Sequence, residues 1–179
     1  MRRQFSAVTV ECIQGDITSQ QDVEAVVNAA NARLEPGGGV AGAIHRAAGP
    51  GLAQEAVPLG PIEPGEALIS GAYELPNRYV IHTLGPVYGQ DRPEAELLAR
   101  CYRNSLALAD DNGLESIAFP AISTGIFGYP AEEAAEVALR TVREEAEGLE
   151  RVRLVRFVLF GEKDLEVHEK ALSGFFGVP

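Results

Sequence analysis

Short segments of alternating apolar and polar residues occur along the whole chain, and this alternation is typical of β-strands with one buried face. Six strands are predicted, over residues 7–13, 23–31, 66–75, 78–85, 115–123 and 151–160. The first alternates most clearly, whereas the second is almost continuously apolar and ends in a turn at Asn28 to Asn31. The third and fourth strands follow each other closely, which is consistent with a hairpin.

Helical spacing of apolar residues separates several of these strands. Helices are predicted over residues 41–49, 93–112, 130–147 and 164–176. The second is the clearest, because Leu97, Leu98, Cys101 and Tyr102 share one helical face and Gly113 stands where a C-terminal cap belongs. Strands and helices interleave through the second half of the chain, which favours a largely parallel or mixed sheet with helices on both faces.

The composition indicates one soluble α/β domain over residues 1–179. The chain has 179 residues, 46% of them hydrophobic, which is enough for one compact core and too little for two. No window supplies the ~20 apolar residues of a membrane helix. The N-terminus lacks the features of a signal peptide, so we expect a cytoplasmic protein without membrane association. The sequence does not indicate an oligomeric state.

The charge and the reactive residues exclude several function classes. A net charge of −11 repels a phosphate backbone, so general nucleic-acid binding is not expected. Cys12 and Cys101 belong to no C-x-x-C pair or Cys/His cluster, so we expect two reduced core thiols, no metal site and no cofactor. The only lysines, Lys163 and Lys170, follow no glycine loop, and an anionic ligand must therefore be held by local dipoles.

One glycine loop, "GGGVAG" at residues 37–42, matches the G-x-G-x-x-G pattern of dinucleotide-binding folds. In those folds the loop follows its strand directly, and an acidic residue ends the next strand about 20 residues later. Here "AANARLEPG" separates the strand from the loop, and the candidate acid Glu63 lies in "GPIEPGE", which cannot form a strand. The sequence therefore does not support a dehydrogenase.

The loop retains the physical properties of an anion-binding site. Its glycines allow close approach to a ligand, and a helix begins immediately behind it. A second glycine loop, "STGIFGYP" at residues 123–130, also lies between a strand and a helix. The two loops together are suited to hold one diphosphate from opposite sides. The alternative interpretation is that both are only tight turns.

A series of motifs spanning about Cys12 to Phe160 resembles the macrodomain family, whose members bind ADP-ribose. The motifs are "QGDIT", "VVNAAN", "GGGV", "GAIHRAAGP", "VIHTLGPVY" and "PAISTGIFGYP", in the order and approximate spacing of that family. The resemblance implies a three-layer α/β/α sandwich around a mixed six- or seven-stranded sheet. It also implies ADP-ribose, or a mono-ADP-ribosylated protein, as the partner.

The resemblance places the adenine near three residues. Asp16, expected at the end of the first strand, would accept a hydrogen bond from the adenine amino group, and Ile17 would contribute its backbone N–H. Phe160 would stack on the adenine ring. The alternatives are that Asp16 caps a turn and that Phe160 is a core aromatic residue.

The resemblance assigns the remaining ligand contacts to the two glycine loops. One phosphate and its neighbouring ribose would contact Gly38, Gly39, Val40 and Gly42. The other side would be formed by Ser123, Thr124, Gly125, Ile126 and Phe127, with Phe127 over the terminal ribose. Asn31 would bond the hydroxyls of that ribose, whereas Asn28 is expected to stabilise the turn.

The chain departs from the hydrolytic branch of the family at one position. That branch removes ADP-ribose from acidic side chains or acetyl from O-acetyl-ADP-ribose, and it has an aspartate where this chain has Ala41. Asn31 is the one candidate catalytic residue, and structural roles are expected for His45 and His82. We expect a binder, with slow hydrolysis as the alternative. An enzyme for a cyclic phosphate ester would need a placed base or a metal pair, and the sequence shows neither.

Overall fold

The structure, a computed structural model, describes residues 1–177 and contains one mixed seven-stranded sheet. The strands are β1 (Arg2–Phe5), β2 (Val8–Gln14), β3 (Ala25–Ala29), β4 (Ala67–Gly71), β5 (Tyr79–Thr83), β6 (Ser116–Phe119) and β7 (Leu154–Leu159). Their order across the sheet is β1-β2-β7-β6-β3-β5-β4. The inner strands run parallel, and the edge strands β1 and β4 are antiparallel to their neighbours.

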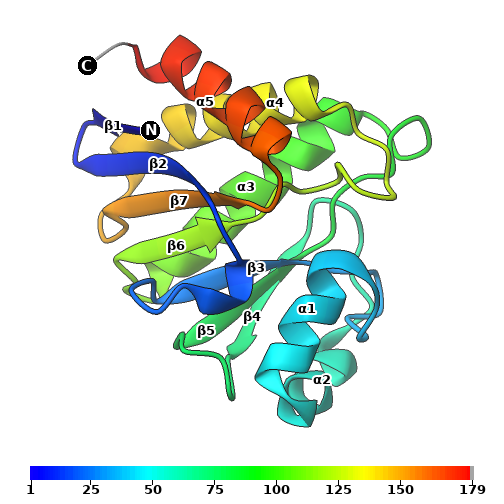
Figure 1. The fold of residues 1–179 in the computed structure, drawn as a ribbon. Coiled ribbons are helices and arrows are strands. Elements are labelled where there is room, and N and C mark those ends of the chain that lie inside the picture. Colours follow the sequence, from blue (N-terminus) through cyan, green and yellow to red (C-terminus); the bar gives the residue numbers. More distant parts are fainter. Residues whose placement is uncertain (178–179) are drawn as a thin grey trace.

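Helices cover both faces of the sheet and make it the middle of three layers (Figure 1). The helices are α1 (Gly39–Ala48), α2 (Pro50–Ala56), α3 (Glu94–Asp111), α4 (Ala131–Glu145) and α5 (Glu162–Phe176), with 3-10 turns η1 (Ile17–Ser19), η2 (Val57–Leu59) and η3 (Ala146–Gly148). Helices α3, α4 and α5 pack on one face, and α1 and α2 pack on the other. The expected three-layer sandwich is confirmed.

The period-two alternation of the strands divides the core between these two faces. On the face under α3, α4 and α5, Phe119 and Phe157 are fully buried and stack with ring centroids 5.7 Å apart. On the opposite face, Ala118 and Val158 pack in the cluster that contains Ile44 of α1. Within one strand, successive residues therefore pack against the helices on opposite faces of the sheet.

All six predicted strands and all four predicted helices are present, with ends shifted by a few residues. The pairing of β4 with β5 is antiparallel, as expected for a hairpin. Cys12 and Cys101 are buried free thiols, as predicted. Within residues 1–177, no helix combines the length and apolar character needed to cross a bilayer.

The sequence interpretation missed two short elements. Strand β1 forms a hairpin with β2 through a turn in which Ser6 has a φ of 56°. No helix was predicted directly after residue 49, but Pro50 is the first residue of α2. A proline is well suited to that place, because the N–H that it lacks would have no helical partner there.

Candidate functional site

A cleft of about 360 Å³ opens where parallel strands of the sheet end. Ligand sites of open α/β sheets commonly lie at this edge. The lining residues come from the ends of β3 and β6, the loop after β5 and the two glycine loops; they are Ala29, Ala30, Asn31, Gly37, Gly38, Gly39, Val40, Ala41, Gly85, Ala121, Ile122, Ser123, Gly125, Ile126 and Phe127. The two glycine loops, far apart in sequence, thus form the two rims of one cleft.

The first rim, residues 37–41, is the N-terminus of α1. The N-cap residue Gly38 has no side chain to occupy the first-turn amides, and Gly39 has a φ of 56°, which favours glycine. The uncapped amides and the helix dipole favour an anion at this place. Gly42 does not line the cleft, but a Cβ there would collide with the carbonyl oxygen of Gly37. The absence of a side chain at Gly42 therefore allows the Gly37 carbonyl to pack directly against α1.

The second rim, residues 123–127, is built by a loop. Ser123 has a φ of 67°, an uncommon value for a residue other than glycine and one that costs energy. The turn is closed by hydrogen bonds from the Gly128 amide to the Gly125 carbonyl at 3.0 Å and from the Tyr129 amide to the Ser123 carbonyl at 2.9 Å. In the described part of the chain, no group accepts a hydrogen bond from the amides of Gly125, Ile126 or Phe127.

The second rim differs in one respect from the expectation, which placed a helix directly behind it. The lining ends at Phe127, and α4 begins only at Ala131, so the second rim presents loop amides and not a helix N-terminus. Gly85 packs closely against this loop, and a Cβ at residue 85 would collide with the Ser123 side chain. The rim can therefore donate hydrogen bonds to an anion without the help of a helix dipole.

The predicted adenine residues lie beside the cleft, at the carboxyl ends of β2 and β7. Asp16 follows β2, the second strand and not the first as expected, because β1 precedes it. Its Oδ1 accepts hydrogen bonds from the backbone N and Oγ1 of Thr18, at 2.8 and 2.7 Å, and these bonds lower the pKa of Asp16. Asp16 therefore caps η1 through Oδ1, while Oδ2 takes no part in that cap.

The side chain of Phe160 is on the surface. Its exposed fraction is 90%, so the interpretation as a core aromatic residue is wrong. Two hydrogen bonds hold its position beside Asp16: the Gly15 amide donates to the Leu159 carbonyl at 2.9 Å, and Gln14 Nε2 donates to the Phe160 carbonyl at 3.3 Å. An exposed aromatic ring at this edge is available for stacking.

The two asparagines of "VVNAAN" have different environments. Asn31 lines the cleft, and its side-chain amide exchanges hydrogen bonds with the backbone of Glu35 at 2.7 and 3.0 Å. Asn28 was expected to stabilise the turn, and this is wrong: it is fully buried in β3, where its Nδ2 donates to His82 Nδ1 at 3.1 Å. Asn31 therefore stabilises the turn between residues 31 and 35, and it also lines the cleft.

Comparison with known proteins decides the family. Residues 27–138 match the family model described as the Macro domain. The chain belongs to the macrodomain family. It is 50% identical over 174 residues to an O-acetyl-ADP-ribose deacetylase of Klebsiella pneumoniae, covering 94% of this chain and 99% of that protein.

Two solved macrodomain structures share the fold of this macrodomain. The Oceanobacillus iheyensis macrodomain with ADP superimposes with a TM-score of 0.91 at 41% identity, covering 97% of this chain and 95% of that one. The Trypanosoma brucei macrodomain in complex with ADP-ribose superimposes with a TM-score of 0.86 at 40% identity, covering 93% of this chain and 71% of that one. The resemblance inferred from the motifs is thereby confirmed.

The histidines of the macrodomain lie in its interior. His82 is fully buried in β5, its Nε2 lies 2.8 Å from Ser70 Oγ, and burial lowers its pKa to about 4. Since Ser70 Oγ donates to the Gly71 carbonyl and Asn28 donates to His82 Nδ1, the ring is neutral and carries its proton on Nε2. His45 is buried in α1, and desolvation lowers its pKa.

Ala41 lines the cleft in the first turn of α1, with an exposed fraction of 5%. A methyl group can neither accept a proton nor orient a water molecule at this position. Within residues 1–177, no three His, Cys, Asp or Glu side chains converge as a metal site requires.

The structure brings together eight of the predicted binding residues as lining of the cleft: Asn31, Gly38, Gly39, Val40, Ser123, Gly125, Ile126 and Phe127. Asp16, Ile17, Gly42, Thr124 and Phe160 are not part of this lining. The sequence interpretation assigned no ligand contact to seven lining residues, namely Ala29, Ala30, Gly37, Ala41, Gly85, Ala121 and Ile122, although it placed Gly37 and Ala41 in the anion-binding loop. All seven lie within or directly beside the quoted motifs, so extending the predicted site to the whole of each motif would have included them.

Proposed function

We propose that this macrodomain, taken as one domain over residues 1–179, binds ADP-ribose and related ADP-ribose derivatives. The observation that carries the proposal is the pair of amide-rich rims facing each other across one cleft. The Trypanosoma brucei macrodomain in complex with ADP-ribose, 40% identical to this chain, supports the choice of ligand. A mono-ADP-ribosylated protein in the cytoplasm is the corresponding macromolecular partner.

In this proposal, each part of ADP-ribose is assigned to the part of the site whose chemistry suits it. The diphosphate lies between the rims, contacting Gly38, Gly39 and Val40 on one side and residues 123–127 on the other. Asn31 faces the terminal ribose, and Phe127 covers it. Thr124 contributes through the backbone of its rim, and Gly42 contributes by leaving room for the Gly37 carbonyl of the first rim.

The adenine lies at the carboxyl ends of β2 and β7. Asp16 Oδ2 accepts a hydrogen bond from the 6-amino group, since Oδ1 is occupied by Thr18. The Ile17 backbone N–H donates to the ring, and the exposed Phe160 stacks on it. Base stacking on an aromatic side chain contributes about 1 to 3 kcal/mol.

Main-chain amides are sufficient to hold a diphosphate in a protein with a net charge of −11. Each hydrogen bond to a charged group contributes about 1.5 to 3 kcal/mol, and micromolar affinity corresponds to about 8 kcal/mol. Four or five such bonds therefore reach that affinity. The neutral rims also add no charge that would attract nucleic acids in general.

The second candidate function is slow hydrolysis of the bound derivative. The deacetylase of Klebsiella pneumoniae, 50% identical to this chain, favours it, and Ala41 opposes a fast reaction. Loss of a general base typically slows a reaction by about 10² to 10⁴-fold. Asn31, at the ribose end of the cleft, is the candidate for positioning a water molecule.

Calorimetric titration with ADP-ribose, ADP, AMP and NAD tests the binding proposal. We expect ADP-ribose to bind most tightly, because it alone offers a free terminal ribose together with the diphosphate. Equal affinity for AMP would show that the rims do not hold a diphosphate. Absence of binding to all four nucleotides would refute the proposed function.

Hydrolysis of a glutamate-linked ADP-ribosyl substrate and of O-acetyl-ADP-ribose, followed on the same samples, tests the second candidate. We expect slow turnover by the wild-type protein and acceleration by Ala41→Asp of about tenfold or more. Ala41→Asn is the matched control, because it adds similar bulk without a basic carboxylate. Rapid wild-type turnover would show that a carboxylate at this position is not needed.

A further inference from the structure

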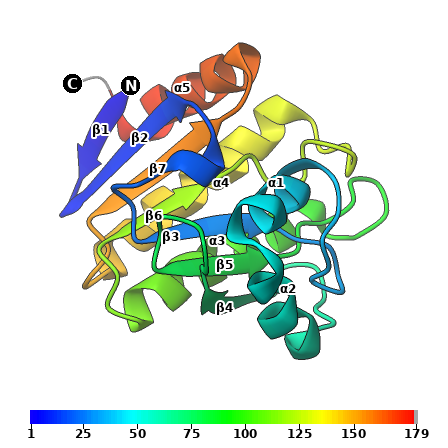
Figure 2. The ribbon, with the colours of Figure 1, turned by 60° about the horizontal axis from the view of Figure 1, so that its bottom comes forward.

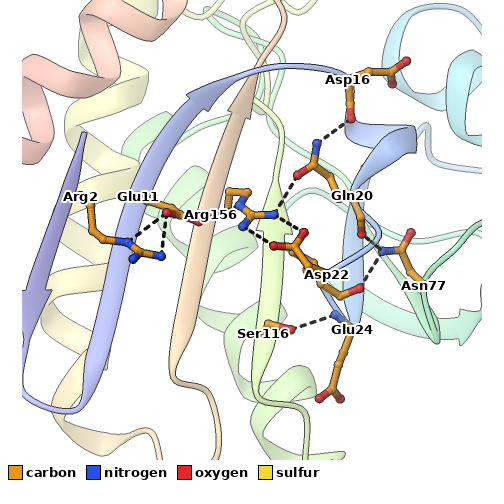
Figure 3. Close-up of polar contacts among 10 residues, drawn as sticks. Arg2, Glu11, Asp16, Gln20, Asp22, Glu24, Asn77, Ser116 and Arg156 are labelled. Carbon is orange, nitrogen blue, oxygen red and sulfur yellow. Dashed lines mark hydrogen bonds and ion pairs between the residues drawn. The ribbon is translucent and has the colours of Figure 1, made fainter.

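The connection between β2 and β3, residues 15–24, is called the crossover segment here. It crosses over β7 and β6 on the face that α1 only partly covers (Figure 2). Asp16 and Ile17 stand at its beginning. Its second half is fixed to the scaffold: Asn77 Nδ2 donates to the Gln20 and Val23 carbonyls at 2.7 Å, and the Glu24 amide donates to Ser116 Oγ at 2.9 Å (Figure 3).

A single buried arginine lies beneath the crossover segment. Arg156 is in the middle of β7, with an exposed fraction of 8%, and points away from the core face on which Phe157 packs. Its Nε donates to Glu11 Oε1 at 2.8 Å, and Glu11 is its register partner on β2. Its two terminal nitrogens donate to the two carboxylate oxygens of Asp22 at 2.7 and 2.8 Å. This bidentate geometry fixes the guanidinium plane.

Gln20 connects this arginine to the adenine end of the segment. Arg156 Nη1 donates to Gln20 Oε1 at 3.0 Å, and Gln20 Nε2 donates to the Asp16 carbonyl at 2.8 Å (Figure 3). The orientation of the amide is determined, because a guanidinium has only donors and a carbonyl only accepts. The side chain is buried, so water does not compete for either bond.

We propose that Gln20 and Arg156 are positioning residues for the nucleobase. Arg156 orients the Gln20 amide, and the amide holds the Asp16 carbonyl, so that the Asp16 carboxylate and the Ile17 N–H meet the hydrogen-bonding edge of adenine. The inference rests on the proposed function, since it concerns how the same site selects its base. The rims bind the diphosphate independently of this chain of contacts.

Gln20→Glu separates positioning from folding. A carboxylate at this position keeps the contact with Arg156 and strengthens it through charge. It also places an acceptor against the Asp16 carbonyl, where two oxygen atoms repel each other. We therefore expect the fold to be retained and the start of the crossover segment to shift.

The experiment compares two nucleotides in calorimetric titrations: ADP-ribose and its inosine analogue, in which a carbonyl replaces the 6-amino group. The analogue has an acceptor at position 6 and an N1–H donor where adenine has an acceptor, so its edge matches neither Asp16 nor the Ile17 N–H, and its binding depends mainly on the rims. We expect Gln20→Glu to weaken ADP-ribose binding about tenfold and the analogue less than about twofold. Arg156→Lys loses the planar fork and should show the same difference at a smaller size.

Arg2→Lys is the matched control. Arg2 belongs to the same charged cluster, because its Nε donates to Glu11 Oε2 at 3.1 Å, but it contacts no residue of the crossover segment. We expect unchanged affinity for both nucleotides. Thermal unfolding of each variant checks the fold. Gln20→Met, which has a similar size and makes neither hydrogen bond, replaces Gln20→Glu if that variant does not fold.

Equal weakening for the two nucleotides would overturn the inference, because it would show a general structural effect. Unchanged ADP-ribose affinity in Gln20→Glu and Arg156→Lys would overturn it as well. Failure of the wild-type protein to bind either nucleotide would instead refute the proposed function, and the inference with it. The three results are distinguishable from the same set of titrations.

Discussion

The two ends of the candidate site are built on different physical principles. The rims at residues 37–41 and 123–127 offer main-chain amides, and four of their ten residues are glycines. The adenine end depends on side chains instead: Asp16 is held by Gln20, and Gln20 by the buried Arg156. In the proposed complex, a bulky or negatively charged side chain would disrupt the rims, whereas a change of one polar group would disrupt the adenine end.

Under the proposed function, this difference follows from what each end has to recognise. A phosphate oxygen accepts a hydrogen bond from any amide, so neutral backbone is sufficient and no side chain is required. A nucleobase presents donors and acceptors in a fixed order, so its partners must be held in a defined orientation. In the proposed complex, polar and charged side chains supply that orientation, and the ion pair of Arg156 with Asp22 makes part of the stability of this region depend on pH.

The largest expected effect comes from adding bulk to a rim. Gly125→Glu should reduce ADP-ribose affinity at least about a hundredfold, because the carboxylate blocks the cleft and repels the diphosphate. The fold should be retained, since, apart from Gly125 and its two chain neighbours, no described residue has an atom within 4 Å of a Cβ at this position. Calorimetry and circular dichroism measure the two outcomes.

Gly125→Ala is the control, because it adds one methyl group in the same open space. We expect it to bind ADP-ribose with nearly wild-type affinity. Retained binding in Gly125→Glu would show that the diphosphate lies elsewhere and that the contrast between the two ends is mistaken.

A smaller effect is expected at the adenine end. Asp16→Ala should weaken ADP-ribose binding about tenfold, since a charge-assisted hydrogen bond contributes about 1.5 to 3 kcal/mol. Asp16→Asn keeps an oxygen that accepts from Thr18 and should therefore preserve the cap of η1. It should still weaken binding, because its NH₂ group faces the adenine amino group. Unchanged affinity in both variants would exclude Asp16 from the site.

The smallest effect concerns stability at acidic pH. Hydrogen bonds from Arg156 lower the pKa of Asp22 to about 2, from 3.8. A lowered pKa in the folded state means that the stabilisation is present above about pH 4 and is lost as the pH falls toward 2. The side chain of Asp22 is 68% exposed, so we expect less than about 1 kcal/mol.

Urea unfolding of wild-type protein and Asp22→Asn at pH 6 and pH 3 measures this contribution. The difference in free energy of unfolding between the two proteins should be larger at pH 6 and should shrink at pH 3. An equal difference at both pH values would mean that the Asp22 carboxylate is not stabilised by Arg156.

Much of the fold and of the cleft could be predicted from local sequence. The alternating strands and the helix over Glu94–Asp111 were found because their periodicity is strong. Strand β1 was missed because its four residues, with exposed and half-buried positions, carry little apolar signal. Helix α2 was missed because a proline both ends and begins helices. The rims were predicted because each lies in a glycine-containing loop between a predicted strand and a predicted helix.

The contacts that hold the proposed adenine end could not be predicted from local sequence. Arg156 stood in the predicted strand over residues 151–160 with nothing to mark it as different from the other arginines there. Asn28 was assigned to the turn because its neighbours are turn residues, whereas its partner, His82, is 54 positions away. Such pairings depend on which strands become neighbours in the sheet.

The sequence by itself determined six of the seven strands, most of the helices, the two glycine loops and the family, because these depend on residue types within a few positions of each other. Only the tertiary structure decided that the loops face one cleft and that Arg156 lies under Gln20, 136 positions away in the chain. The physical reason is the strand order, which places β7 next to β2 and leads the crossover segment above both β7 and β6.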